Sequence, residues 1–396
     1  MKEKLTLKTH RLAVFALFAV NGLLYASWAA RVPAIQDQYQ ISDASMGLVL
    51  ITASLGAFIS MPFAAFINER LGVMKVCLLT SLLYIFIIPL IPFFSAPIML
   101  FILYACMGVA FGLLDVAMNA QAVEVEHAYE KPILSSFHAA FSAAMICGAL
   151  ASSLIIKLGI AFQWHMIVVA IVALGLTLYA YPRLYPNEKK EDELVQEDSS
   201  AFRLPVRATW LIGAIGFCSM MSEASISDWT SKYMLEIAGS AEYMAPWSLA
   251  AFAITMTVGR IFGDRFRETI GDQIILRYGS CFAFIGMLIS LAYPSPLTTI
   301  LGAGMVGSGL SIAVPIIFSL SGNIPKLSAS AALSMVTSIS YLGLFLGPAV
   351  IGFLTERFDL RIGYGFILAA LAMMVVLTWQ IKEVKLDITE ENLERV

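Results

Sequence analysis

Ionisable side chains stand inside long apolar stretches of this sequence, and their residue types favour proton binding. Asp115 is followed four residues later by Asn119, a spacing that places both side chains on one face of a helix. His138 carries an imidazole, which titrates near neutral pH, and Glu223 is a second carboxyl in an apolar stretch. A charged side chain at the centre of a bilayer costs about 2.5–3.5 kcal/mol on insertion scales. Because so costly a residue needs a reason to be there, we predict that Asp115, Glu223 and His138 bind and release protons.

Each of these residues also has another interpretation. The carboxyl of Asp115 can be satisfied by neighbouring helices, and His138 can be a neutral buried imidazole bonded to a carbonyl group. Glu223 can serve as a second proton site or bind a hydroxyl or amine of a solute. The residues alone leave these alternatives open.

A second group of residues combines amide and aromatic side chains. We predict that they line a cavity for a polar, ring-shaped solute; the group consists of Asn21, Tyr25, Trp28, Asn119 and Trp229. Trp28 and Trp229 fit equally well as aromatic residues at the two membrane interfaces, where the amphipathic indole ring is favoured.

The composition identifies the kind of chain that must position these residues. Of 396 residues, 59% are hydrophobic and 13% are charged, and the mean hydropathy is +0.81. Soluble globular proteins have about 45–50% apolar and about 25% charged residues. The net charge of −3 gives no basic excess for binding phosphates. The sequence therefore predicts an all-α membrane protein, and excludes a soluble enzyme, a nucleic-acid binder and a disordered chain.

Motifs for catalysis, metal binding and cofactor binding are missing from the sequence. It contains no phosphate-binding GxxxxGK[ST] loop, no HExxH and no GxSxG. We therefore expect no catalytic residues, no metal and no cofactor. The cysteines form no CxxC or CxxH pair, and we expect them to be small buried apolar residues: Cys77, Cys106, Cys147, Cys218 and Cys281.

Apolar stretches long enough to cross a bilayer recur twelve times along the chain. They are predicted at 12–34, 44–67, 74–94, 97–122, 133–156, 162–182, 207–234, 243–264, 272–293, 297–321, 328–355 and 362–381. The most polar stretch of the chain, 184–206, divides them into six and six. We predict an N-terminal half at 1–183, a cytoplasmic linker at 184–206, a C-terminal half at 207–382 and a cytoplasmic tail at 383–396.

Lysine and arginine residues fall mainly on one side of the predicted spans. With both termini in the cytoplasm, the bases left on the outer side are Arg31, Lys157, Lys232, Arg357 and Arg361, out of 25 in the chain. Cytoplasmic loops carry an excess of these residues in membrane proteins. The pattern predicts that both termini are cytoplasmic, and we expect a bacterial inner membrane.

The two halves contain similar short sequences at equivalent positions. The first span ends in Trp28-Ala-Ala-Arg31, and the seventh ends in Trp229-Thr-Ser-Lys232. The fourth and tenth spans share a Gly-Leu pair, and acid-Arg pairs follow the second and eighth spans at nearly the same separation. Repeated halves with a binding site between them are an architecture of secondary transporters.

Twelve spans in two six-helix halves with a charged central loop resemble the major facilitator superfamily along the whole chain. The signature of that superfamily after the second span, Gly-x-x-x-Asp-Arg-x-Gly-Arg-Arg/Lys, is partly met by Glu69, Arg70 and Gly72. The corresponding loop of the second half contains Asp264 and Arg265. The resemblance implies the pseudo-symmetric major facilitator fold, and it implies that these four charged residues take part in gating.

A narrower resemblance is to the fucose–proton symporter branch, which has Gly-Leu-x-x-acid-x-x-x-Asn on the fourth span. Residues 112–119 here read Gly-Leu-Leu-Asp-Val-Ala-Met-Asn. The branch has Ser-Phe-Asn on the fifth span, where residues 136–138 read Ser-Phe-His. The aspartate that the branch carries on the first span has no match, because Asn21 is the strongly polar residue deep in that span.

Arg31 and Asp228 lie toward the outer ends of the first and seventh spans. These two helices face each other across the outer vestibule in the fold that the chain resembles. We predict that the two side chains pair when the outside closes and so form a gate. Each of them can also extend its charged group from the helix end to the membrane interface.

Together these features predict a proton-coupled symporter that moves a small polar solute, such as a sugar, by alternating access. An exporter that exchanges drugs or metabolites for protons is the alternative within the same fold. A membrane sensor or scaffold and a channel are further alternatives, but single buried acids differ from the rings of charge in ion channels. The expected partners are the solute, the proton and the lipid bilayer, with no nucleic acid, and we expect a monomer.

Overall fold

The computed structural model describes residues 6–130, 133–186, 207–321, 324 and 329–381. In these residues the chain forms helices joined by short turns. Twelve helical segments of this described part are long and apolar enough to cross a bilayer. The predicted all-α membrane fold with twelve spans is therefore confirmed.

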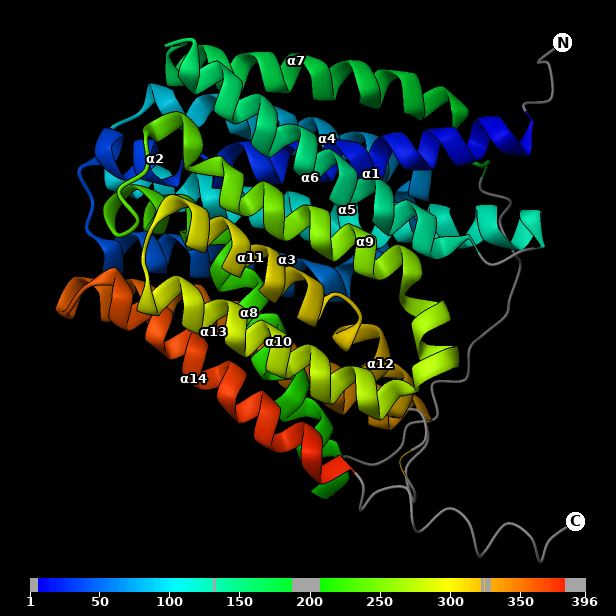
Figure 1. The fold of residues 1–396 in the computed structure, drawn as a ribbon. Coiled ribbons are helices and arrows are strands. Elements are labelled where there is room, and N and C mark those ends of the chain that lie inside the picture. Colours follow the sequence, from blue (N-terminus) through cyan, green and yellow to red (C-terminus); the bar gives the residue numbers. More distant parts are fainter. Residues whose placement is uncertain (1–5, 131–132, 187–206, 322–323, 325–328, 382–396) are drawn as a thin grey trace, which may run out of the picture.

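The helices run back and forth along one direction in two groups (Figure 1). The first group contains α1 (Leu7–Ala29), α2 (Val32–Tyr39), α3 (Asp43–Leu71), α4 (Val73–Leu90), α5 (Pro97–Tyr129), α6 (Leu134–Lys157) and α7 (Phe162–Ala180). The second contains α8 (Arg207–Glu236), α9 (Pro246–Ile270), α10 (Asp272–Ala292), α11 (Pro296–Leu310), α12 (Ala313–Ser321), α13 (Ala329–Arg357) and α14 (Leu360–Trp379). Short 3₁₀ turns are η1 (Ile91–Phe93), η2 (Tyr181–Arg183) and η3 (Glu242–Met244).

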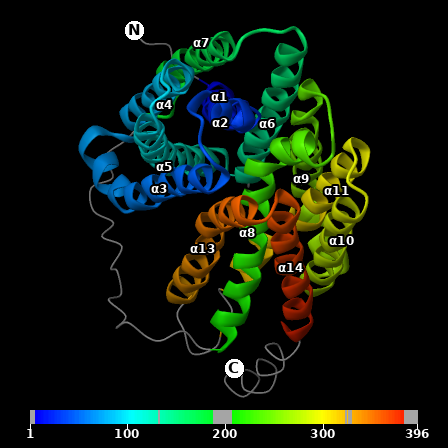
Figure 2. The same ribbon diagram turned by 90° about the vertical axis from the view of Figure 1, so that its left-hand side faces the viewer.

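We call the end of the bundle where α1 begins and α14 ends the terminal end, and the opposite end the distal end. Viewed from the distal end, α1 to α7 form one group and α8 to α14 form the other (Figure 2). The two groups correspond to the predicted N-terminal and C-terminal halves. Of the predicted linker 184–206 and tail 383–396, all but residues 184–186 lie outside the described residues.

Two glycines at equivalent places reverse the chain in the two halves. Gly72 follows α3 with φ of 83°, and Gly271 follows α9 with φ of 87°. A side chain is strained at such angles, so glycine is favoured. In each half this turn joins the second long helix to the third, as expected for a duplicated half.

Two predicted spans are interrupted in the structure, and proline accounts for both breaks. The predicted span 12–34 ends at Ala29 and is followed by the separate helix α2, and the predicted span 297–321 is divided between α11 and α12. A proline ring clashes with the carbonyl four residues earlier. That position is Ala29 for Pro33 and Ser311 for Pro315, which are the places where the helices break.

The prediction that all five cysteines are buried holds for two of them, and Cys281 is only partly buried. Cys77 and Cys218 are buried, whereas Cys106 and Cys147 are exposed. A thiol behaves as a small apolar group and is tolerated on a surface that faces lipid. All five are free thiols.

Close packing between α3 and α5 brings these helices together beside the centre of the molecule. An added Cβ at Gly108 would lie 1.8 Å from the carbonyl oxygen of Ala53, and one at Gly112 would lie 2.7 Å from that of Ala57. Small residues at helix contacts in membranes allow such backbone approach. This contact fixes the segment of α5 that carries Asp115.

We predict that Gly108→Ala lowers the free energy of unfolding by about 1–3 kcal/mol, because the methyl group must push α3 away. The measurement is thermal unfolding of the detergent-solubilised protein, followed by circular dichroism. Gly175→Ala is the matched control, since nothing lies within 4 Å of an added Cβ on that helix. The control should leave the midpoint unchanged or raise it slightly, because alanine favours helix. Equal midpoints for the two variants would contradict the packing role of Gly108.

Candidate functional site

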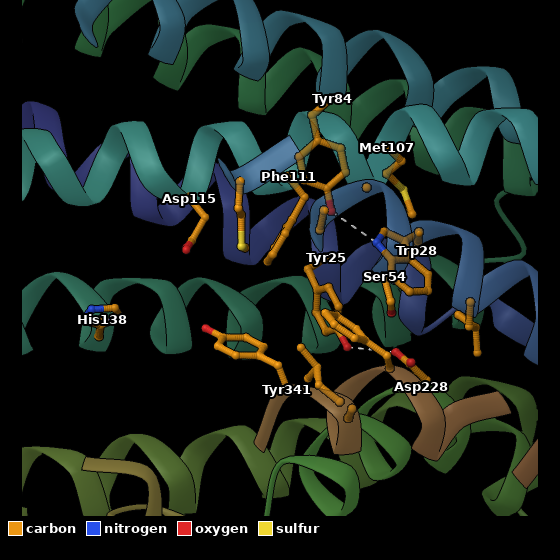
Figure 3. A pocket seen from close by; sticks show the side chains of 18 residues that line it. Tyr25, Trp28, Ser54, Tyr84, Met107, Phe111, Asp115, His138, Asp228 and Tyr341 are labelled. Atoms are coloured by element: carbon orange, nitrogen blue, oxygen red, sulfur yellow. Dashed lines mark hydrogen bonds between the residues drawn. The ribbon is translucent and has the colours of Figure 1, made fainter. Parts of the chain in front are cut away.

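A cavity of about 350 Å³, which we call the central cavity, lies between the two halves (Figure 3). The first half contributes residues from α1, α3, α4, α5 and α6, and the second half contributes residues from α8 and α13. The lining consists of Tyr25, Trp28, Leu50, Ala53, Ser54, Ala57, Met61, Tyr84, Met107, Gly108, Phe111, Asp115, His138, Ala224, Asp228, Tyr341, Leu344 and Phe345. The walls are thus mainly apolar and aromatic, with a few polar groups.

Asp228 is the more buried of the two aspartates in the lining, with 7% of its surface exposed. Its Oδ1 accepts a hydrogen bond of 2.8 Å from the hydroxyl of Tyr25. Tyr25 belongs to α1 and Asp228 to α8, so this bond joins the first long helices of the two halves. A buried carboxyl is costly unless it is bonded or neutralised. Tyr25 provides one such bond.

Asp115 lies on α5 in another part of the same cavity. The amide of Asn119 donates to the backbone carbonyl of Asp115 at 2.8 Å and lies 3.4 Å from its carboxyl oxygen. In Figure 3, Asp115 and His138 lie toward one side of the cavity and Asp228 toward the other, with Phe111 and Tyr25 between them. The cavity therefore holds two separate carboxyl groups.

Aromatic rings occupy the space between the two carboxyl groups. Trp28 packs edge-on against Tyr25 and Tyr104, with ring centroids 5.1 and 5.4 Å apart. The indole nitrogen of Trp28 donates to the hydroxyl of Tyr84 at 3.3 Å. Since the polar tips of Trp28 and Tyr84 are bonded to each other, their ring surfaces are left to contact a solute.

The structure places four of the predicted proton and solute residues in the central cavity, and these are Tyr25, Trp28, Asp115 and His138. Asp228, which we predicted as a gate residue, joins them. His138 is exposed, and its ring lies edge-on to Phe18 at 5.2 Å.

The remaining predicted solute residues lie outside the cavity lining. The side chain of Asn21 is fully buried near Met118, with its Nδ2 3.9 Å from the sulfur. Trp229 is fully buried as well and donates to the carbonyl of Pro348 on α13 at 3.0 Å. Asn119 holds Asp115 from the neighbouring turn. These three side chains support the wall instead of forming it.

Glu223 also lies outside the cavity lining. Its carboxyl forms an ion pair of 3.2 Å with Arg260 of α9, and about a quarter of each side chain is exposed. The guanidinium of Arg260 also reaches the carbonyl of Ser311 at 3.4 Å. The charge of Glu223 is therefore balanced within its own half.

Sequence reasoning missed Tyr84, Phe111 and Tyr341 as lining residues. Tyr84 and Tyr341 could have been noticed, because each places a hydroxyl group within an otherwise apolar span. Phe111 carries no such signal, because its sequence neighbours are as apolar as it is. Nothing in the residue types tells which of the many aromatics face the cavity.

Among the residues that the structure describes, two ion pairs join the halves at the distal end, and we call them the distal latch. Arg31, after α1, pairs with Glu242 of η3 at 3.6 Å, and Lys232 of α8 pairs with Asp43 of α3. In each pair, a base near the distal end of the first long helix of one half meets an acid after the corresponding helix of the other half. The similar segments Trp28-Ala-Ala-Arg31 and Trp229-Thr-Ser-Lys232 thus lie at equivalent positions in the two halves.

The backbones of α3 and α13 also meet at the distal end. An added Cβ at Gly47 would lie 3.0 Å from the carbonyl oxygen of Ala349, and one at Gly352 would lie 2.5 Å from that of Asp43. The carboxyl of Glu356 accepts a hydrogen bond from the backbone nitrogen of Ala44 at 2.8 Å. We call this contact between the two helices the glycine seam.

The predicted gate pair of Arg31 and Asp228 is not formed, although the distal end is closed. Arg31 donates through Nε to Nδ1 of His165 at 3.0 Å and pairs with Glu242, while Asp228 is bonded to Tyr25. His165 lies on α7 and Glu242 in η3, and both reach Arg31 in its position beyond the end of α1. The prediction is wrong in this conformation, and the latch uses other acids.

The charged residues predicted to gate at the terminal end lie apart from the other half. Glu69 and Arg70 at the end of α3 are exposed, and the guanidinium of Arg70 lies 4.3 Å from the ring of Phe66 on the same helix. Arg265 is also exposed, and the side chain of Asp264 is outside the described part. Between described residues, the ion pairs that join the halves lie at the distal end and the hydrogen bond between Tyr25 and Asp228 joins them at the central cavity, and the helices diverge toward the terminal end (Figure 1). The gating role of these residues stays a prediction.

The sequence is similar to that of known membrane transporters. The model of the Major Facilitator Superfamily matches residues 13–332. The chain is 32% identical over 359 residues to an uncharacterised MFS-type transporter of Yersinia pestis, covering 91% of this chain and 92% of that protein. It is 27% identical over 363 residues to the membrane protein MosC of Rhizobium meliloti, covering 90% and 86% of the two chains.

Solved structures with the same fold are much more distant in sequence. The nucleoside transporter NupG superposes with a TM-score of 0.73 at 15% identity, covering 94% of this chain and 98% of that one. A bacterial homolog of the human lysosomal transporter Spinster, in an inward-facing and occupied conformation, gives a TM-score of 0.73 at 12% identity, covering 96% and 98%. At this identity the likeness concerns the fold alone.

The two pairs of the distal latch should contribute unequally. Lys232 and Asp43 have side chains that are 8% and 17% exposed, whereas Glu242 is 67% exposed. Removing one partner of a buried pair costs about 3–5 kcal/mol, but an exposed pair contributes only about 0–1 kcal/mol. We predict that Lys232→Met opens the distal end and that Glu242→Gln has little effect.

The measurement is the distance between spin labels at exposed positions Gln40 and Ala241, by electron–electron double resonance, after replacement of the native cysteines. Lys232→Met should add a longer-distance population. Arg277→Gln is the matched control, because Arg277 bonds the carbonyl of Thr378 within its own half. An unchanged distribution in Lys232→Met would show that this pair does not hold the distal end closed.

Proposed function

Since this chain belongs to the major facilitator superfamily, we propose that it is a proton-coupled secondary transporter that carries a small polar solute through the central cavity by alternating access. The family match and the related transporters make it a multi-pass membrane transporter and not an enzyme. The solute, the coupling to protons and the direction of transport are the content of the proposal. The narrower resemblance to the fucose–proton symporter branch stays a prediction.

One observation carries the proposal of symport: two separate carboxyl groups, Asp115 and Asp228, line one cavity between the halves. A carboxylate in an apolar cavity is destabilised until a proton or a ligand neutralises it. Because the two groups are separated by aromatic rings, one can hold a proton while the other contacts the solute. We assign the proton to Asp115, whose environment is shaped by Asn119, and solute contact to Asp228.

The hydrogen bond between Tyr25 and Asp228 links solute binding to movement of the halves. It joins α1 and α8, so a solute that bonds the carboxyl of Asp228 changes a contact between the two halves. With both carboxyl groups neutralised, the cavity loses its charge, and passage through the closed state becomes less costly. The halves can then rock about the occupied site, as in other transporters built from repeats.

We place both termini in the cytoplasm of a bacterial inner membrane, as the distribution of lysine and arginine favours. The distal end then faces the outside, and the described conformation is closed to the outside and faces the cytoplasm. Glu69, Arg70, Asp264 and Arg265 would form the opposite gate when the cytoplasmic side closes. His138, which is exposed, would relay a proton between Asp115 and that side. The protein would act as a monomer without a cofactor.

Glu223 has a different role in this proposal from the one its sequence position favours. Its ion pair with Arg260 balances its charge within the second half. We therefore assign Glu223 to the attachment of α8 to α9.

Export in exchange for protons is the second candidate, and the lining favours it in one respect. The cavity is mainly apolar and aromatic, which suits lipophilic solutes as well as sugars. If a solute and a proton compete for one carboxyl, occupation by either excludes the other, and exchange results. Two separate carboxyl groups make simultaneous occupation the simpler arrangement.

The test uses proteoliposomes that contain a trapped pH-sensitive dye. Sugars, nucleosides, amino acids and organic amines are added outside one at a time. We expect internal acidification with a transported solute in the wild type. Asp115→Asn should abolish the acidification, because its amide cannot release and bind the proton.

Glu268→Gln is the matched control, since this carboxyl is exposed at the terminal end of α9 and should leave transport unchanged. Internal alkalinisation on solute addition that is absent from protein-free liposomes would establish exchange in place of symport. Full acidification in Asp115→Asn would remove Asp115 from the coupling mechanism.

A further inference from the structure

The central cavity has an unbalanced charge. Among the described residues, its lining contains the carboxyl groups of Asp115 and Asp228 and the imidazole of His138, and no lysine or arginine. The charges of a buried site normally balance, because an unpaired carboxylate in apolar surroundings is costly. The missing positive charge must therefore come from protons or from the solute.

Three basic residues on or next to helices that line the cavity pair with acids outside its lining. Arg31 bonds His165 and pairs with Glu242. Lys232 pairs with Asp43, and Arg260 pairs with Glu223. These bases hold the helices together, and no ion pair between described residues gives the two aspartates of the cavity a basic partner.

We propose that the solute is an organic amine whose ammonium group binds Asp228 and whose ring or apolar body lies among the aromatic side chains of the cavity. This inference rests on the proposed function, since it names the solute class for the same site. Asp228 is suited to the role because Tyr25 occupies only its Oδ1, at 2.8 Å. Its second carboxyl oxygen can accept from an ammonium group, forming a charge-assisted hydrogen bond.

The aromatic walls add a second attraction for a cation. Rings of Tyr25, Trp28, Phe111, Tyr341 and Phe345 line the cavity beside the carboxyl groups. A cation over an aromatic face is attracted by the ring, and more strongly where water is excluded. The volume of about 350 Å³ is near the lower end of known small-molecule sites, so the amine must be small.

A separate observation at the distal end points to the same charge. A polar cleft of about 630 Å³ lies there and is bordered by one base, Lys232, and by four acids, Asp37, Asp43, Glu236 and Glu356. A cleft lined by one sign of charge concentrates ligands of the opposite sign. The cleft lies on the side of the bundle that must open for solute to enter from the distal side. Both the entrance and the cavity therefore favour a cation.

The two carboxyl groups bind different ligands in this proposal. Asp228 binds the amine, and Asp115 binds the coupling proton. Substitution of Asp228 should therefore affect which solute binds, whereas substitution of Asp115 should affect coupling and leave the preference for amines intact. A purely structural role for Asp228 would change stability without changing the preference between charged and neutral solutes.

The experiment measures binding by isothermal titration to the full-length, detergent-solubilised protein. The probes are pairs that differ in charge and little in shape: phenethylamine against 2-phenylethanol, and glucosamine against glucose. In at least one pair we expect the amine to bind at least tenfold more tightly than its neutral partner, the size of effect of one charge-assisted hydrogen bond. Asp228→Asn should reduce this ratio to near one, and Asp115→Asn should preserve it.

Two further variants separate charge from folding. Asp228→Glu keeps the carboxyl and should retain the preference, and Tyr25→Phe removes the hydrogen bond but leaves the charge, so it should retain the preference as well. Equal binding within every pair, including no binding of any probe, overturns the proposal, as does a preference that survives in Asp228→Asn. Amine binding without any pH change in proteoliposomes would support this inference and contradict proton coupling. Proton-coupled transport of neutral solutes alone would do the reverse.

Discussion

A charge inside an apolar helix bundle must have a partner, and this constraint divides the ionisable residues of the protein into two classes. Arg31, Lys232 and Arg260 each have an acidic partner within the protein. Within the part of the chain that the structure describes, the hydrogen-bond partners of Asp115 and Asp228 are neutral, Asn119 and Tyr25. The first class fixes the arrangement of the helices. The second class needs positive charge, which a proton or a cationic solute can supply. This need makes the otherwise apolar cavity a binding site.

The duplicated halves explain why the distal end closes with two related ion pairs. Each half supplies a base at the end of its first long helix and an acid in the segment that follows, and each base meets the acid of the other half. The pairs are not equal, because the second acid lies in an exposed turn. The repeat therefore determines the positions of the charged groups, and the local surroundings determine how strongly they interact.

The sequence predicts the fold well because the bilayer demands long apolar helices, and because glycine, proline and charged residues mark their ends. It also indicates Asp115 and His138, since ionisable residues are conspicuous in apolar spans. It does not distinguish Trp28 from Trp229. Both occur in Trp-x-x-base segments, yet one lines the cavity and the other donates to Pro348. A helix that is apolar on every side has no amphipathic pattern to show which side faces the cavity.

The sequence also could not predict which residues bond Arg31 and Asp228, because these contacts depend on how the helices pack. Glu242 lies in an exposed turn far from Arg31 in sequence, and His165 reaches Arg31 from α7. The sequence placed Arg31 and Asp228 near the same end of the bundle, which is correct. It could not show that nearer groups satisfy each of them first. Such choices depend on distances that only the packed helices define.

The glycine seam has a consequence for the balance between the two conformations. Where α3 meets α13, backbone faces backbone at Gly47 and Gly352, and side chains do not interlock there. Surfaces of this kind can separate without any change of side-chain rotamers. They can also come together again without repacking. The two helices can therefore part at these glycines without any repacking of side chains there. A chain could shift its resting state toward an open distal end by enlarging one residue at the seam, leaving the side chains of the cavity unaltered.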